Sequence, residues 1–453
     1  MKQVIAIFDI GKTNKKLILF DTNFEIVSQF EQNFKTICDE DGFECDDIDL
    51  ITDWIYHSLV EIVSGNQFDL LAVNFSTYGA SLIFLDENGK RLTPLYNYLK
   101  PVDKNFSAKL FEKYGDKDHF CRKTASPDLG LLLNSGIQIL WLNQEKPDTF
   151  LKVRHILHFP QYLSFRLTGQ INSEPTSIGC HTFLWDYDLI KYHKWITDYN
   201  IKLPELVYNN QVFKSTINGK EFLTGTGIHD SSASLVPYLK TCNEKFILVS
   251  TGTWCINMNP FNHEPLTNYQ LENDCLCFLS PEMKQVKSSR LFMGHFHDTW
   301  LEKISAYFKI ASDHFKKLNL DGENIEQAFR KYKDKKVYFP LGKESFEKVL
   351  DDFNFGIFTS YKEAYLQLLI ELSNLCVDSI NLIIGKPNEI EKLYVTGGFT
   401  KNEIFVYLLK LQFPGIEVIV KHLTNSSALG AAMAIADTLN LKINKQITKV
   451  AQF

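Results

Sequence analysis

The chain has 453 residues, more than one hydrophobic core usually organises, so two domains of similar size are expected. Hydrophobic residues make up 45% and charged residues 23% of the sequence, as in ordinary soluble globular proteins. The net charge of −6 argues against general nucleic-acid binding, and no apolar run approaches the roughly 18 residues of a membrane span.

The first predicted element is a buried β-hairpin over residues 5–21, in which two apolar runs flank a polar turn centred on Gly11. A glycine lets the backbone approach a nucleotide phosphate, and the residues after it supply charge and donors. The candidate phosphate ligands are Gly11, Lys12, Thr13, Asn14 and Lys16. Asp9, at the end of the first strand, is placed to hold a magnesium ion through water. Lys15 is expected to be a solvated charge of the turn.

This turn has two other interpretations. Residues 11–13 copy the end of a Walker A loop, but that loop needs a glycine at position 6, where Ala6 stands, and a helix after Thr13, where the pattern is strand. A charged hairpin turn without function is common in isolation, so the rest of the chain must decide.

Strands and helices then alternate, which predicts an α/β domain with a substrate site at the carboxyl ends of its strands. The expected elements are a strand over 24–32, a helix over 47–63, strands over 70–76 and 82–90, and mostly helix over 105–200, where Gly169 ends one helix. A glycine-rich loop near residue 225 leads through Asp230 into small residues. Taken alone, Asp230 would cap a helix that begins at Ser231.

Residues 246–258 repeat the opening pattern of strand, glycine-centred turn and strand, with Thr251, Gly252 and Thr253 in the turn. The repeat indicates an internal duplication and a second domain that begins near residue 245, although a chance match of two hairpins is the alternative. Two facing turns can grip a phosphate chain from both sides.

The remaining pattern predicts helix over 296–335, a strand that runs into a loop over 335–344, a long helix over 360–385, a strand over 417–420 and a helix over 427–439. Between them, a strand over 393–396 leads to Gly397 and Gly398, which let the backbone lie flat against a base or a ribose. His295 and His297 are expected in a loop before a helix capped by Asp298, rather than on a metal. Cys275 and Cys277 are likewise expected to pack on a strand.

In this order and spacing, the motifs resemble those of the FGGY carbohydrate kinases, within the superfamily of sugar kinases, chaperones and actin. The matching segments are 9–13, 167–169, 229–230, 250–254, 396–398 and 428–432. Residues 250–254 (Ser-Thr-Gly-Thr-Trp) are most similar to the rhamnulokinase branch, and residues 229–230 to that branch and the fuculokinases. The resemblance covers nearly the whole chain and implies an α/β fold of two ribonuclease H-like (actin-like) ATPase domains, residues 1–243 and 244–453, with a nucleotide and sugar cleft between them.

The resemblance also implies a set of site residues. Asp230 would be the general base and, with Asp9, a magnesium ligand. Phosphates would lie between the two turns. Adenosine would face Gly397, Gly398 and Asn402. The sugar would contact Thr77, Tyr78, Gly79, Asn97 and His229, although Tyr78 and His229 are left open between a sugar contact and a packed residue. The sugar loop lacks the acid that often follows it in the family, Tyr96 and Tyr98 flank Asn97 where an Asp and an Arg often stand, and Asn425 takes the place of a further acid, so fewer charged sugar contacts are implied.

These features lead to one main hypothesis, a kinase that uses ATP and Mg²⁺ to phosphorylate a ketose or deoxyketose such as L-fuculose or L-rhamnulose. The alternatives are a catalytically weak relative that senses sugar or ATP, and an actin-like ATPase that acts on protein. Small-molecule sugars are the expected partners, with no nucleic acid and no membrane, and a homodimer is left open. Nine dispersed cysteines and a first strand that begins almost at once predict a cytoplasmic protein without a signal peptide.

Overall fold

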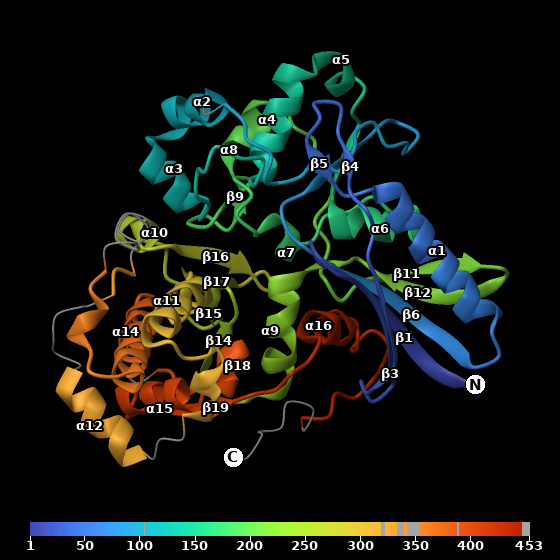
Figure 1. Ribbon diagram of the computed structural model, residues 1–453. Coiled ribbons are helices and arrows are strands. Elements are labelled where there is room, and N and C mark those ends of the chain that lie inside the picture. Colours follow the sequence, from blue (N-terminus) through green and yellow to red (C-terminus); the bar gives the residue numbers. More distant parts are fainter. Residues whose placement is uncertain (104, 319–321, 333–338, 342–352, 387–388, 446–453) are drawn as a thin grey trace.

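The computed structural model describes residues 1–103, 105–318, 322–332, 339–341, 353–386 and 389–445. Two mixed β-sheets organise the molecule, one in each half of the chain, and short helices of the first half lie above both sheets (Figure 1). The expected α/β fold is therefore confirmed. The strand expected to begin at residue 335 falls largely outside the described residues.

The elements of the first half are, in order, β1 (Lys2–Ile10), β2 (Lys15–Asp21), β3 (Ile26–Gln32), β4 (Ile37–Cys38), β5 (Glu44–Cys45), α1 (Ile48–Ser64), β6 (Phe68–Thr77), β7 (Leu82–Leu85), α2 (Asn105–Tyr114), α3 (Lys117–Lys123), α4 (Ser135–Glu145), α5 (Pro147–Phe150), β8 (His155–His158), α6 (Phe159–Thr168), α7 (Pro175–Ile178), β9 (Trp185–Asp186), β10 (Lys191–Tyr192), α8 (Lys194–Asp198), β11 (Val212–Ile217), β12 (Lys220–Gly225), β13 (Ile228–His229) and α9 (Asp230–Thr241).

Those of the second half are β14 (Phe246–Thr251), β15 (Cys255–Asn259), α10 (Asn268–Glu272), β16 (Cys275–Leu279), β17 (Gln285–Leu291), α11 (Met293–Phe308), η1 (His314–Lys317), α12 (Gly322–Tyr332), η2 (Phe355–Ile357), α14 (Tyr361–Asn381), β18 (Lys392–Gly397), η3 (Gly398–Lys401), α15 (Glu403–Gln412), β19 (Glu417–Val420) and α16 (Ser426–Ala434).

The first sheet explains why the opening run is apolar without alternation. Its strand order is β11-β12-β6-β1-β2-β3, with β1 antiparallel to β2 and parallel to β6. Alternate residues of β1 enter two different cores. Val4, Ala6 and Phe8 pack with α1, whereas Ile5 and Ile7 pack with α16. A strand covered on both faces needs apolar residues at successive positions.

The second sheet has the order β16-β17-β15-β14-β18-β19. Its strand β14 is antiparallel to β15 and parallel to β18, as β1 is antiparallel to β2 and parallel to β6. The repeated hairpin that the sequence indicates is thus present, with a parallel strand beside each copy. Cys275 and Cys277 are buried on β16.

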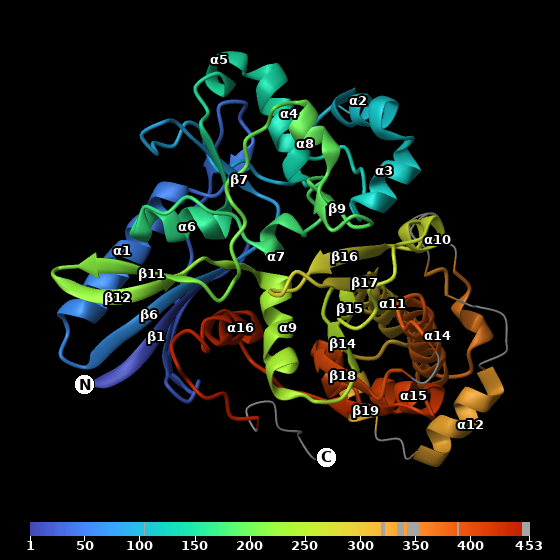
Figure 2. The same ribbon diagram turned by 180° about the vertical axis from the view of Figure 1, so that it is seen from behind.

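Helices α9 and α16 cross between the two sheets (Figures 1 and 2). A Cβ atom at Gly430 would lie 1.8 Å from the carbonyl oxygen of Ala233, so only glycine permits this approach. The Asn74 side chain on β6 donates to the carbonyl of Ala431 at 2.8 Å. The C-terminal helix is therefore tied both to α9 and to the first sheet.

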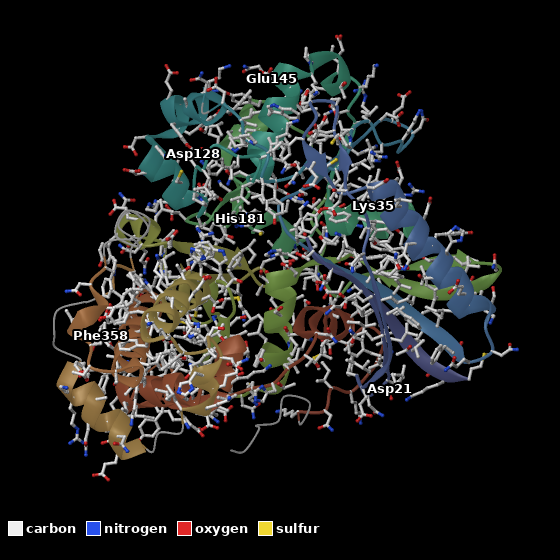
Figure 3. The ribbon with its side chains drawn as sticks, in the orientation of Figure 1. Asp21, Lys35, Asp128, Glu145, His181 and Phe358 are labelled. Atoms are coloured by element: carbon white, nitrogen blue, oxygen red, sulfur yellow. The ribbon has the colours of Figure 1, made fainter. Side chains whose placement is uncertain are left out.

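The region of residues 105–200 consists mostly of short helices, with three short strands among them, and α6 ends as expected. Gly169 adopts a φ of 68° and its N–H donates to the carbonyl of Phe165. The segment after α7 reaches the second sheet, because the Tyr187 hydroxyl donates to the carbonyl of Cys277 at 3.0 Å. His181, in that segment, lies at the boundary between the upper helices and the second sheet (Figure 3).

Candidate active site

In each glycine-centred turn the glycine N–H donates to a carbonyl further along the turn, three residues on in the first turn and two residues on in the second. The N–H of Gly11 donates to the carbonyl of Asn14 at 2.9 Å, and that of Gly252 to the carbonyl of Trp254 at 3.0 Å. Thr13 and Asn14 are exposed, so their polar groups are accessible to a ligand.

The ends of β14 and β18 are joined tightly at Gly397. A Cβ atom there would lie 1.8 Å from the carbonyl oxygen of Thr251, and the φ of 87° also favours glycine. The Thr251 hydroxyl donates to the carbonyl of Thr396 and accepts from the N–H of Phe399. Gly397 therefore packs directly against the backbone of Thr251, where the second turn begins.

Beside the second turn lies a cavity of about 860 Å³, which is large enough for a nucleoside with phosphates. Gly252, Thr253, Gly398 and Asn402 line it, so the structure brings together these four predicted nucleotide residues. Asn402 caps α15 by accepting from the N–H of Phe405, and its side-chain amide donates to the Tyr365 hydroxyl at 2.8 Å. These two hydrogen bonds fix the Asn402 side chain at the cavity wall.

His297 and Asp298 also line this cavity, but from within α11. The expectation of a loop capped by Asp298 is therefore wrong. Gly294, in the first turn of this helix, is required by the close approach of the second turn, because a Cβ atom there would lie 2.3 Å from the carbonyl oxygen of Gly252.

The lysines of the first turn have three different environments. Lys16 extends across to α16, where its ammonium lies 3.4 Å from Asn425 Oδ1. Lys12 instead donates to Asp46 Oδ2 at 2.8 Å. Lys15 is only 3% exposed and donates to Asp46 Oδ1 at 2.8 Å, so the expectation of a solvated charge is wrong. The expectation failed because Lys15 pairs with Asp46, and no local pattern of the sequence relates Asp46 to this turn.

Asp9 and Asp230 are two carboxylates close enough for their charges to interact. Asp9 accepts from the Ser427 hydroxyl at 2.8 Å, a contact between β1 and α16. Burial raises the pKa of Asp9, and the charge of Asp230 raises it further. Burial also raises the pKa of Asp230 from 3.8 to about 6. Two such carboxylates near each other favour a bound cation.

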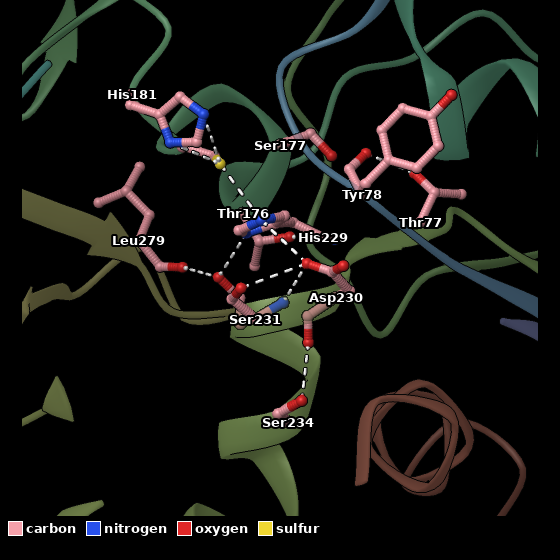
Figure 4. Close-up of polar contacts among 12 residues, drawn as sticks. Thr77, Tyr78, Thr176, Ser177, His181, His229, Asp230, Ser231, Ser234 and Leu279 are labelled. Carbon is pink, nitrogen blue, oxygen red and sulfur yellow. Dashed lines mark hydrogen bonds and ion pairs between the residues drawn. The ribbon is translucent and has the colours of Figure 1, made fainter. Parts of the chain in front are cut away.

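Asp230 is the first residue of α9, so it lies one position later than the cap that the sequence alone suggests. Its Oδ1 accepts from the N–H of Ser231 at 2.6 Å (Figure 4). The positive end of the helix thus faces this carboxylate. The side chain is 35% exposed, so the carboxylate remains accessible to a small molecule.

His229 packs directly behind Asp230. Burial lowers its pKa to about 3, so the imidazole is neutral at physiological pH. Its Nε2 lies 3.2 Å from Asp230 Oδ1 and 3.2 Å from Cys180 Sγ (Figure 4). Because the ring is neutral, its contact with Asp230 is not an ion pair between two charges.

The loop predicted to bind sugar lies against His229. Thr77 pairs with His229 between β6 and β13. A Cβ atom at Gly79 would lie 2.5 Å from Cys180 Sγ and 2.8 Å from the His229 ring. The Thr77 hydroxyl donates to the carbonyl of Tyr78, and the Asn97 amide donates to the carbonyl of Glu44. These two polar groups are thus used inside the protein.

Two mixed sheets, each with a glycine turn at the end of its central hairpin, define an α/β protein built from two similar halves. Solved structures share this fold. A carbohydrate kinase from Novosphingobium aromaticivorans superimposes with a TM-score of 0.77 at 20% identity, over 96% of this chain and 93% of that one. A ligand-bound xylulose kinase from Lactobacillus acidophilus gives a TM-score of 0.75 at 16% identity, over 99% and 93%.

Residues 4–235 match the N-terminal domain of the FGGY family of carbohydrate kinases, and the chain belongs to this family. A rhamnulokinase from Yersinia pestis is 28% identical over 254 residues, which are 54% of this chain and 50% of that protein. A rhamnulokinase from Oceanobacillus iheyensis is 25% identical over 281 residues, 59% and 58% of the two chains. The chain thus matches about half the length of these curated relatives. Within the described ranges, every helix is too short or too polar to cross a bilayer.

Proposed function

We propose that the protein is an ATP-dependent sugar kinase in which Asp230 is the general base. The observation that carries this proposal is the position of Asp230, an accessible carboxylate at the start of α9, close enough to Asp9 for their charges to interact. A pKa of about 6 leaves most of this group ionised at neutral pH, and it still accepts a proton more readily than an ordinary aspartate.

The residues support a direct transfer between two oxygens. Asp230 accepts the proton of the acceptor hydroxyl as that oxygen bonds to the γ-phosphorus, and the bond from this phosphorus to the bridging oxygen breaks, which releases ADP. Thr13, Asn14 and Lys16 on one side, and Gly252 and Thr253 on the other, hold the phosphates by N–H, hydroxyl and ammonium donors. The alignment of these groups is the main catalytic contribution of the protein.

A magnesium ion fits the donor set. Asp9 and Asp230 are carboxylates whose pKa values are both raised, and a divalent cation would favour their ionised forms. The described residues contain no group of three or more side chains that could hold a metal, so the ion would take its other ligands from water and phosphate oxygens. When bound, it supplies neutralisation of the phosphate charge.

We propose a ketose or deoxyketose as the acceptor, with L-rhamnulose and L-fuculose as the first candidates. The named rhamnulokinase relatives and the segments 229–230 and 250–254 support this choice. We also propose two domains, residues 1–243 and 244–453, and a cytoplasmic location. The location is supported by nine cysteines that are all free.

The test is ADP release from Mg-ATP over a panel of ketoses, aldoses and polyols, with Asp230→Asn as the inactive control. We expect at least one ketose to stimulate release in the unmodified protein and none to do so in the variant. If no sugar stimulates release, the kinase proposal is wrong. Thermal stabilisation by sugar or ATP without turnover would instead favour the sensing relative considered above.

A further inference from the structure

A cluster that we call the Asp46 cluster lies beside the first turn. Three donors converge on this buried carboxylate, which is 4% exposed: the ammonium groups of Lys12 and Lys15 and the hydroxyl of Tyr78, each at 2.8 Å. The Lys12 ammonium also lies 5.5 Å from the ring centroid of Tyr78 and 5.7 Å from that of Tyr98. Such contacts hold a cation through both charge and aromatic faces.

The two lysines of the cluster are not equivalent. Lys15 is 3% exposed and also donates to the carbonyl of Lys12 at 3.0 Å, so its role is to neutralise Asp46 inside the protein. Lys12 is 29% exposed, and Asp46 Oδ2 is its single hydrogen-bond acceptor among the described residues. An ammonium has three N–H donors. Lys12 therefore keeps donor capacity on a side that solvent reaches.

That side is the acceptor side of the site. Tyr78 directly precedes Gly79, whose backbone lies against His229 and Cys180. The pKa of Tyr98 is raised by burial and by the charge of Asp230, which places its phenol within electrostatic range of the proposed base. Lys16, by contrast, lies on the α16 side of the turn. The neighbouring lysines thus extend in different directions from one turn.

We propose that Lys12 binds the acceptor sugar and not the nucleotide phosphates, with Asp46 as its positioning residue and the half-buried ring of Tyr98 against an apolar face of the sugar. This inference rests on the kinase function proposed above and revises the assignment of Lys12 made from the sequence. Ammonium groups donate to sugar hydroxyl oxygens, and aromatic rings cover the C–H faces of sugars, so the pair suits a neutral polyhydroxylated acceptor.

The test separates the two substrates kinetically. Lys12→Met should raise the KM of the best acceptor by about tenfold or more, the effect of losing a charged hydrogen bond to substrate. The dissociation constant of ATP, measured without sugar, should stay within about twofold. Lys12→Arg keeps a cation there and should recover most of the loss. Because Lys15 and Tyr78 still hold Asp46, Lys12→Met is expected to fold, which its thermal transition checks.

Lys123→Met is a matched control. Lys123 pairs with Asp186 at 3.0 Å, with side chains 21% and 4% exposed, close to the 29% and 4% of Lys12 and Asp46. It should leave both constants unchanged. A weaker affinity of Lys12→Met for ATP with an unchanged acceptor KM would overturn the inference while the kinase function stands. If Lys12→Met fails to fold, the Lys12→Arg variant and a titration of the acceptor into the unmodified protein at varied ATP decide the same question. An unmodified protein without any sugar-stimulated turnover would refute the kinase function itself.

Discussion

Replacing Asp230 by Asn should abolish turnover and yet stabilise the protein at alkaline pH. In the folded protein the pKa of Asp230 is about 6, against an ordinary value of 3.8. A group whose pKa is raised on folding contributes most to stability below its unfolded pKa, and this contribution is lost as pH rises through the folded pKa. The ionised carboxylate therefore costs stability above pH 6, and asparagine removes that cost.

The difference between the two pKa values corresponds to about 3 kcal/mol for a fully enclosed group. The side chain of Asp230 is 35% exposed, and solvent screening reduces the effect, so a gain of about 1 kcal/mol at pH 8 is expected. At pH 4 most of the gain should disappear, because the carboxyl is then protonated in the folded protein. The main hydrogen bond remains possible, since an asparagine oxygen can accept from the N–H of Ser231.

Thermal unfolding of both proteins at pH 4, 6 and 8 measures this difference. Asp188→Asn is the control with the opposite sign, because its pKa is lowered by the hydrogen bond from Arg122, so the substitution should destabilise at pH 8. In the unmodified protein, kcat/KM should fall about tenfold per pH unit below pH 6. A variant that is less stable than the unmodified protein at pH 8, or that retains turnover, would refute the assignment of Asp230.

Three further substitutions test other parts of the site. Gly397→Ala should lower the free energy of unfolding by about 2 kcal/mol or more, because the new Cβ would lie 1.8 Å from a backbone oxygen. Gly398→Ala should leave it unchanged, because a Cβ there meets nothing within 4 Å. Thermal unfolding of the two variants tests this difference. Asn402→Ala should cost about 1 kcal/mol as a lost helix cap and weaken ATP binding, as unfolding and titration calorimetry would report. Lys15→Met should lower the free energy of unfolding by about 2 kcal/mol more than Lys12→Met does, because Lys15 is the buried partner of Asp46. The unfolding temperatures of the two variants measure this difference.

Local pattern was enough to predict the framework of the fold. The hairpin over residues 5–21, the strand over 417–420 and the helix end at Gly169 follow from apolar runs and glycine positions, which depend on neighbours in sequence. The start of α11 was missed because Gly294 looks like a loop residue. It is a glycine because Gly252, far away in the chain, comes too close for any side chain.

The sequence indicated which residues gather near the candidate site better than it indicated what each side chain contacts. Gly252, Thr253, Gly398 and Asn402, which the sequence assigns to the nucleotide, line one cavity. Thr77 and Asn97 instead use their polar groups within the protein, and the burial of Lys15 depends on Asp46, a residue 31 positions away. Pairings of this kind arise from tertiary packing, so no motif in the sequence could have reported them.

The repeated hairpins explain why the two halves have different tasks. Two positions before the turn glycine, β1 carries Asp9, whereas β14 carries Ser250. The first copy of the repeat therefore has a carboxylate at this position, which suits the cation and proton of the proposed mechanism, whereas the second copy has a neutral hydroxyl. The tight crossing of α9 and α16 then connects both tasks, because α9 begins with Asp230 and α16 supplies the Ser427 hydroxyl that holds Asp9. A helix contact that only a glycine allows thus joins the helix that begins with Asp230 to the helix that holds Asp9.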